Sequence, residues 1–155
     1  MNINDVIKKA LNTLSSEIQT LRVETRLNRN LDEIQADADQ IYQTILNLIL
    51  NARDATPPNG RLIIRTGDRG NWCHICIADT GKGIEKGVLE SIFKPFYSGK
   101  RGGIGLGLTI AHKIVESHRG RIRVKSIEGR GTVFLIILPK RRKEAKERWK
   151  SSFLL

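Results

Sequence analysis

Residues 79–108 begin with Asp-Thr-Gly-Lys-Gly-Ile, continue with Phe-Lys-Pro-Phe-Tyr-Ser-Gly-Lys at 93–100 and end with Arg-Gly-Gly-Ile-Gly-Leu-Gly-Leu. Two glycine clusters flank an aromatic segment, and the carboxylate of Asp79 precedes the first cluster. Glycine permits backbone angles and close approaches that a Cβ atom forbids. The second cluster leads into an apolar pattern with helical spacing, so its amides lie at a helix N-terminus, where an anion is favoured. The stretch predicts a nucleotide site whose middle part is a movable lid.

Residues 37–55 have the spacing of a helix with two different faces. Apolar residues share one broad face, and Asp37 or Asp39 is placed to cap the N-terminus. The other face is a stripe of Gln40, Thr44, Asn47, Asn51 and Asp54. Two interpretations stay open for this stripe. It is the solvent side, or it binds a ligand that satisfies its amides, since each buried amide without a partner costs about 1–3 kcal/mol.

The remaining pattern alternates short strands with helices. Helices are predicted over residues 4–18 and about 105–117, with a short helical segment near 85–93. A hairpin is expected around a turn at residues 67–70. The strand candidates are residues 21–25, 34–36, 62–66, 72–78, 121–126 and 132–138.

Length and composition indicate one globular domain with a sizeable core. The chain has 155 residues, of which 39% are hydrophobic and 28% charged, as in ordinary soluble domains. No apolar run approaches the roughly 20 residues of a membrane span. We expect a cytoplasmic domain, and a membrane anchor elsewhere on a longer parent chain stays possible.

The formal net charge of +11 is concentrated at the C-terminus. Residues 140–150 hold seven Lys or Arg and two Glu, which supplies +5 of that charge. We therefore divide the chain into a domain at 1–139 and a basic tail at 140–155. Basic residues are not interleaved with aromatic ones as in single-strand binders, so we interpret the tail as solvated or as a link, and expect no nucleic-acid partner.

Cys73 and Cys76 have the CxxC spacing of redox and zinc motifs. Their surroundings read as a strand, however, and positions three apart in a strand point to opposite faces. No second cysteine pair is present to complete a metal site. We interpret both as structural thiols.

Four sequence motifs, in their order along the chain, resemble those of the ATP-binding catalytic domain of bacterial two-component sensor histidine kinases. The resemblance covers roughly residues 1–139 and extends to the superfamily with the Bergerat ATP-binding fold, which includes gyrase, mismatch-repair and heat-shock chaperone ATPases. It implies an α+β fold, a two-layer sandwich in which three helices back a mixed sheet of about five strands. The motifs are an N box at 47–55, a glycine box at 79–83, an F box at 93–97 and a second glycine box at 103–108.

The resemblance also implies roles in binding ATP and Mg²⁺. Asp79 would accept from the adenine amino group, with Thr132 joined to it through a water. Asn51 would place its amide oxygen on Mg²⁺, and Lys100 would pair with a phosphate. Asn47, Asn51 and Lys100 are the expected catalytic residues. The nucleotide-binding set is Asn47, Asn51, Asp54, Ala55, Asp79, Gly81, Gly83, Ile84, Ser98, Lys100, Gly103, Gly105, Leu106, Gly107, Leu108 and Thr132.

One position separates branches of the superfamily. The ATPases place a Glu, the base that activates water, one turn before the Mg²⁺ asparagine, whereas this chain has Asn47, which cannot take a proton. The resemblance therefore implies a kinase that transfers the γ-phosphoryl group to a histidine on a separate dimerisation domain, with a response regulator downstream. The isolated domain is expected to be monomeric.

The chain departs from the family pattern in three places. Asp54 stands where relatives often have a basic residue, and Ser98-Gly99-Lys100 replaces Thr-Thr-Lys after the F box. None of the three histidines is followed by the acidic residue of a phosphoacceptor.

Three alternative functions stay open beside the histidine kinase. The first is a serine-kinase anti-sigma factor, against which the F box argues, and the second is an ATPase clamp, against which Asn47 argues. The third is a basic DNA-binding module.

Overall fold

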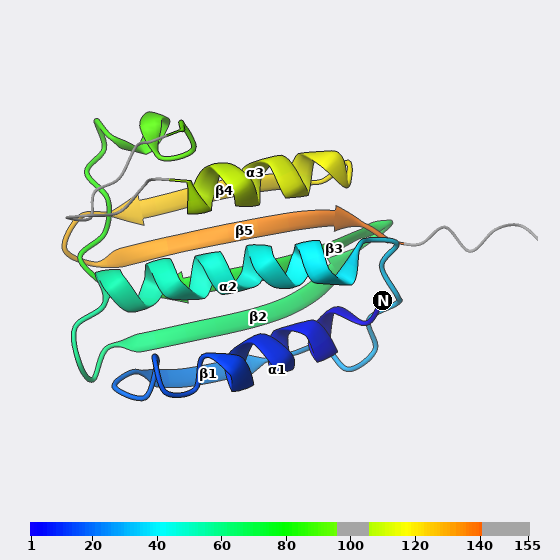
Figure 1. Ribbon diagram of the computed structural model, residues 1–155, viewed down its shortest axis with the longest axis horizontal. Coiled ribbons are helices and arrows are strands. Elements are labelled where there is room, and N and C mark those ends of the chain that lie inside the picture. Colours follow the sequence, from blue (N-terminus) through cyan, green and yellow to red (C-terminus); the bar gives the residue numbers. More distant parts are fainter. Residues whose placement is uncertain (96–105, 141–155) are drawn as a thin grey trace, which may run out of the picture.

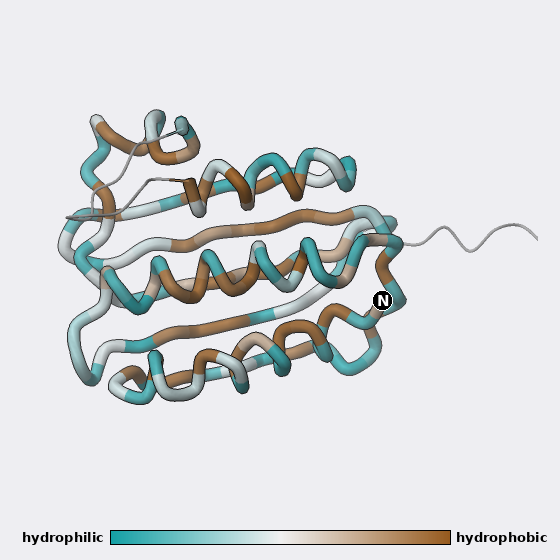
Figure 2. The backbone as a smooth tube through the Cα atoms, in the orientation of Figure 1, coloured by the Kyte–Doolittle hydropathy of each residue, from teal (hydrophilic) through white to brown (hydrophobic). Residues whose placement is uncertain are grey.

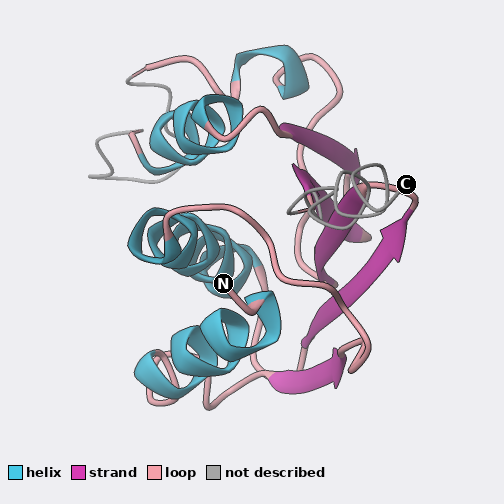
Figure 3. Ribbon diagram, turned by 90° about the vertical axis from the view of Figure 1, so that its right-hand side faces the viewer, coloured by secondary structure: helices cyan, strands magenta, loops and turns pink. Residues whose placement is uncertain are grey.

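The computed structural model describes residues 1–95 and 106–140, in which five strands form one sheet and three α-helices lie on one of its faces (Figures 1 and 3). The helices are α1 (Ile3–Thr13), α2 (Ala38–Ala55) and α3 (Gly107–Ser117), with a short 3-10 helix η1 (Leu89–Ser91). The strands are β1 (Arg22–Arg26), β2 (Arg61–Arg69), β3 (Trp72–Asp79), β4 (Arg121–Ile127) and β5 (Gly131–Pro139).

The sheet has the strand order β1-β2-β3-β5-β4. β1 and β2 are parallel, and α2 connects them, because parallel neighbours need a crossover. All other neighbours are antiparallel. This mixed sheet backed by three helices confirms the predicted fold class.

Helix α2 lies in the middle of the helical layer and carries much of the core. Its Asp37 cap accepts hydrogen bonds from the N–H groups of Asp39 and Gln40, at 3.0 and 3.1 Å, so of the two predicted caps Asp37 is the one used. Figure 2 shows apolar segments along the strands beneath the helices. The buried apolar side chains of α2 are Ile41, Ile45, Leu48, Ile49 and Ala52.

Several predicted boundaries are wrong. The first helix ends at Thr13 instead of residue 18, because Ser15 and Ser16 favour turns over helix, although Leu14 and Ile18 are buried as predicted. Of the strand candidate at 34–36, only Ile34 pairs, through a single bridge to Lys140.

The hairpin turn and the segment at 85–93 also differ from prediction. β2 and β3 continue their pairing through Arg69 and Trp72, so the turn is Gly70-Asn71, with Gly70 at φ +57°. In the segment at 85–93, only η1 is helical.

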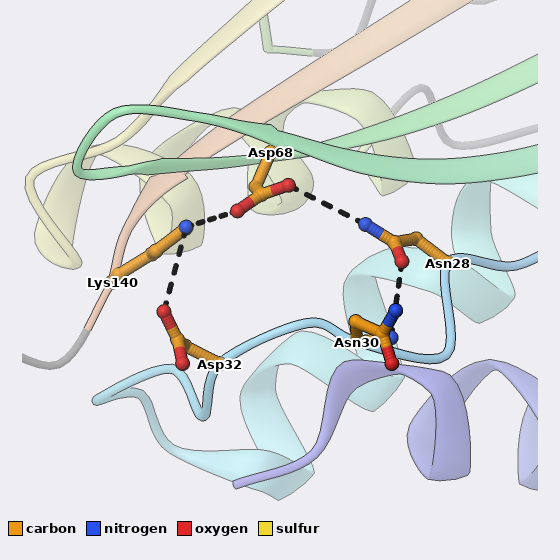
Figure 4. Close-up of polar contacts among 5 residues, drawn as sticks. All are labelled: Asn28, Asn30, Asp32, Asp68 and Lys140. Atoms are coloured by element: carbon orange, nitrogen blue, oxygen red, sulfur yellow. Dashed lines mark hydrogen bonds and ion pairs between the residues drawn. The ribbon is translucent and has the colours of Figure 1, made fainter.

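A polar cluster joins the end of β5 to the β2–β3 hairpin and to the loop after β1 (Figure 4). The Lys140 ammonium contacts the carboxylate of Asp68 and lies 3.6 Å from that of Asp32. The Asn28 amide donates to Asp68 at 3.4 Å, and the backbone N–H of Asn30 donates to Asn28 at 3.0 Å. Lys140 therefore belongs structurally to the folded part, whereas residues 141–155 of the predicted tail lie outside the described residues.

The two cysteines lie in β3 and face opposite ways, as predicted. Cys73 is buried under the helices, and Cys76 is half-buried on the other face. Burial raises the pKa of the Cys73 thiol to about 11, with the nearby Asp68 carboxylate adding to the effect.

We therefore expect iodoacetamide, at mildly alkaline pH, to modify Cys76 and leave Cys73 intact. Burial raises the pKa of Cys76 too, but the Arg65 guanidinium opposes that rise and the thiol is partly accessible. Intact-mass measurement should show one adduct on the native protein and a second only in denaturant. Equal modification of both thiols in the native protein would contradict this placement.

Candidate nucleotide-binding site

Asp79 stands at the last position of β3, and its carboxyl group is largely enclosed. Its exposed fraction is 8%, and its Oδ1 accepts the backbone N–H of Gly81 at 2.9 Å. Burial raises the pKa of this carboxyl, while the backbone N–H groups of Gly81 and Thr132 partly oppose the rise. A carboxylate held in this way is suited to accept a hydrogen bond from a ligand amino group.

Gly81 is required by the close approach of two chain segments. A Cβ atom there would lie 2.3 Å from the carbonyl oxygen of Ala55, the last residue of α2. That carbonyl accepts the N–H of Lys82 at 2.9 Å. The first glycine box therefore fastens the end of β3 to the end of α2, in addition to the nucleotide binding that the family resemblance implies for Gly81.

Thr132 lies directly opposite Asp79 in the β3–β5 register and is 4% exposed. Its hydroxyl lies 2.8 Å from that of Ser126, which also donates to the carbonyl of Gly131 at 2.9 Å. Since Ser126 has one proton and gives it to Gly131, the proton between the two hydroxyls comes from Thr132. The N–H of Ile84 donates to Ser126 as well, at 2.7 Å.

Gly83 has φ +71°, and a Cβ atom there would lie 2.3 Å from the carbonyl oxygen of Ile127. The carbonyl of Lys82 accepts the N–H of Gly129 at 2.7 Å. Together with the Ser126 contacts, this packing joins the first glycine box to the β4–β5 turn.

The second part of the site lies on α2. The Asn47 amide donates to the carbonyl of Gly107 at 3.1 Å, so the polar stripe contacts the start of α3. Asn47 and Asn51 are half-buried and Thr44 is fully buried, which rules out a simple solvent side for the middle of the stripe. Asp54, which is exposed, forms an ion pair with Arg53 at 2.7 Å.

The structure brings part of the second glycine box into this region. Leu106 caps α3 and Gly107 begins it, next to Asn47, while Leu108 packs against the core. The other predicted residues between the F box and α3 lie outside the described residues. These are Ser98, Lys100, Gly103 and Gly105, and the F-box aromatic residues Phe96 and Tyr97 lie outside the described residues as well.

The start of the predicted lid is anchored on α3. The Thr109 hydroxyl donates to the carbonyl of Phe93 at 2.9 Å. The ring of Phe93 lies 5.0 Å from that of His112 and 6.4 Å from that of Phe134, measured between centroids. The F-box phenylalanine is therefore held by packing against α3 and β5.

Sequence reasoning missed Ser126 and Thr109. Ser126 follows Ile122 and Val124 in the alternation of β4, so a polar residue stands where the pattern calls for an apolar one. That break was the available signal. Thr109 gave no comparable signal, because a threonine in the first turn of a helix is common.

Residues 36–142 match the family described as histidine kinase-, DNA gyrase B- and HSP90-like ATPase. The catalytic domain of histidine kinase ThkA superposes with a TM-score of 0.82 and 31% identity, covering 90% of this chain and 93% of that one. The chain belongs to the histidine kinase catalytic domains of this ATPase family.

Longer relatives contain a similar segment. This histidine kinase catalytic domain is 42% identical over 142 residues to the sensor histidine kinase ZraS of Salmonella typhi, covering 90% of this chain and 30% of that protein. It is 32% identical to sporulation kinase C of Bacillus subtilis, covering 88% and 33%. The chain thus spans about a third of these relatives. Within its described ranges, no helix has both the length and the apolar character for a membrane crossing.

Proposed function

We propose that this domain binds ATP with Mg²⁺ and transfers the γ-phosphoryl group to a histidine on a separate dimerisation domain in two-component signal transduction. The observation that carries the proposal is the buried carboxylate of Asp79, held by Gly81 beside Thr132 in a fold shared with the ThkA catalytic domain. This arrangement supports an adenine site at the end of β3. ATP supplies the phosphoryl group, and the protein residues position it.

The α2 stripe supports the phosphate and metal end. Asn51 has the amide oxygen that Mg²⁺ accepts as a ligand, and the ion commonly takes its other oxygens from phosphates and water. Among residues 1–95 and 106–140, no three His, Cys, Asp or Glu side chains converge on a metal position. These donors fit a Mg²⁺ ion carried with the nucleotide better than a resident all-protein metal site.

Asn47 distinguishes transfer to a protein from hydrolysis. Its amide donates to Gly107 and cannot take a proton from water, so ATP is protected from a water attack assisted at this position. The nucleophile is an imidazole nitrogen of the partner histidine. It forms the bond to the γ-phosphorus as the bond to the β–γ bridging oxygen breaks, and ADP leaves.

The three histidines of this chain are not suited to that role. His74 lies in β3, His112 packs on Phe93, and His118 accepts the N–H of Asp37 at 3.0 Å. The acceptor is therefore on another domain. ThkA has been crystallised in complex with the response regulator TrrA, and we extend the expectation of a response-regulator partner to this chain. We also place the domain in the cytoplasm, where ATP is available.

The test is to mix the chain with a histidine phosphoacceptor domain and ATP labelled at the γ-phosphate. We expect acid-labile label on the acceptor, and about a hundredfold slower transfer for Asn51→Ala, because Mg²⁺ loses a ligand. Gln43→Ala, an exposed amide on the same helix, is the matched control and should transfer at the wild-type rate. Acid-stable label would instead indicate a serine kinase, and rapid turnover without an acceptor would indicate an ATPase.

A further inference from the structure

The face of the sheet away from the helices is strongly basic along both edges of the sheet. The helices lie on one face only (Figure 3), over buried residues such as Leu62 and Ile64. Because side chains alternate along a strand, the residues between these buried positions point to the other face. We call this second face the open face.

On β1 and β2 the open face carries Arg22, Arg26, Arg61, Arg65 and Arg69. The first four stand opposite one another in the register, as two arginine pairs across neighbouring strands. Like charges directly opposite each other destabilise a sheet, so the folded domain gains nothing from these pairs itself. The only carboxylate on these two strands' open face, Glu24, forms an ion pair with Arg61 at 2.8 Å.

The opposite edge of the sheet, β4, presents Arg121, Arg123 and Lys125 at alternate positions. Their partners on β5 are apolar, and none of these three cations forms an ion pair within the described part of the chain. Together with the five arginines of β1 and β2, the described strands present eight cations and one carboxylate on the open face.

Between the two basic sides, β3 and β5 supply a centre that is apolar apart from His74, which stands opposite Ile137. Its exposed members include Trp72, 42% exposed, and Val133, 38% exposed, and Ile127 at the end of β4 is 62% exposed. The strands of this face present no Ser, Thr, Asn, Gln or Asp. It therefore has charge and apolar surface but lacks the amides and hydroxyls with which a protein reads a specific partner.

We propose that the open face docks on a membrane surface containing anionic lipids. Clusters of Lys and Arg attract anionic head groups, and Trp is favoured at the membrane–water interface. A single-stranded nucleic acid would need several aromatic platforms, and the described strands present one tryptophan on this face, Trp72. The nucleotide site lies among the helices and the strand ends, so docking by the open face leaves the helical layer directed away from the lipid.

The experiment is sedimentation of the full chain with vesicles of phosphatidylcholine, alone or mixed with phosphatidylglycerol. We expect binding only to the mixed vesicles, and loss of binding as salt rises above about 0.1 M, where the Debye length is about 10 Å. Two variants neutralise the two sides separately: Arg22→Gln with Arg26→Gln, and Arg121→Gln with Arg123→Gln. Each should raise the lipid concentration for half-maximal binding about tenfold.

Two matched variants remove the same charge elsewhere. Lys8→Gln with Lys113→Gln lies on exposed positions of α1 and α3, and Arg141→Gln with Arg142→Gln lies in the basic tail. Both should bind within about twofold of wild type. Equal losses in all four variants, loss only in the tail variant, or no binding by wild type at low salt would overturn the proposal. Tighter binding of the open face to a single-stranded oligonucleotide would assign it to nucleic acid instead. None of these outcomes bears on ATP binding.

Discussion

Asp79→Asn should reduce ATP affinity about a hundredfold while leaving the domain folded. In the wild type, the Asp79 carboxylate accepts a hydrogen bond from the N–H of Gly81 at 2.9 Å. The side-chain oxygen of Asn can accept the same hydrogen bond, so the local backbone keeps it. The NH2 group of Asn, however, is a donor, and it would face the adenine amino group, which is a donor too and needs an acceptor. Two facing donors inside an enclosed site lose a hydrogen bond and leave a polar group unsatisfied, which gives the expected loss. Calorimetric titration with ATP and Mg²⁺ measures it.

The free energy of unfolding of Asp79→Asn provides a second test. Burial raises the pKa of Asp79 in the folded state, so the neutral form is favoured by folding. The stability linked to this group is therefore present at pH below the unfolded pKa and is lost as pH rises through the folded pKa. Asn removes the buried charge, and we expect its free energy of unfolding at neutral pH to equal or exceed that of wild type. Asp39→Asn, at an exposed carboxylate of α2, should bind ATP normally. Wild-type affinity in Asp79→Asn would contradict the assignment of the adenine site.

Gly131→Ala should lower the free energy of unfolding by about 3 kcal/mol or more. A Cβ atom at this position would lie 2.0 Å from the carbonyl oxygen of Asp79 and 3.1 Å from the Cα of Thr80. Both are backbone atoms, so no flexible side chain can move aside. Gly131 also has φ +139°, a conformation that an L side chain rarely adopts. Urea denaturation measures the loss, and ATP affinity should fall with it, because Thr132 is displaced from Asp79.

Gly129→Ala is the control for that substitution. It lies in the same β4–β5 turn at φ +79°, but a Cβ atom there would meet nothing within 4 Å. It should cost only about 1 kcal/mol, from the left-handed conformation alone. If both variants lost the same stability, the close contact with Asp79 would not be the cause.

The sequence predicted the elements whose signals are local. The periodicity of residues 37–55 and the capping position of Asp37 define α2, and alternation defines β3 and β5. The hairpin turn was misplaced because Gly67 has turn chemistry, yet it pairs with His74. Continued pairing with β3 outweighs that local preference. The residues around Gly67 do not show from sequence alone that this pairing continues.

The candidate site, like the fold, could be predicted only in part. Residue types and motif order pointed to Asp79, Asn47 and Gly81, but the contacts between them arise only in the folded chain. Asn47 meets Gly107, and Gly81 meets Ala55, across long sequence separations. The family resemblance assigned Gly81 to the ligand, and its close packing against the end of α2 is a second reason for glycine at this position.

Helix α2 sets the distance between two contacts of the candidate site. Asn47 and Ala55 belong to one uninterrupted helix, which separates them by about 12 Å along its axis. An insertion of one residue between them would rotate one end by about 100° against the other and detach either Asn47 from Gly107 or Ala55 from Lys82. Substitutions on the outer side of α2 should be accepted, whereas any change in its residue count between these two contacts should not.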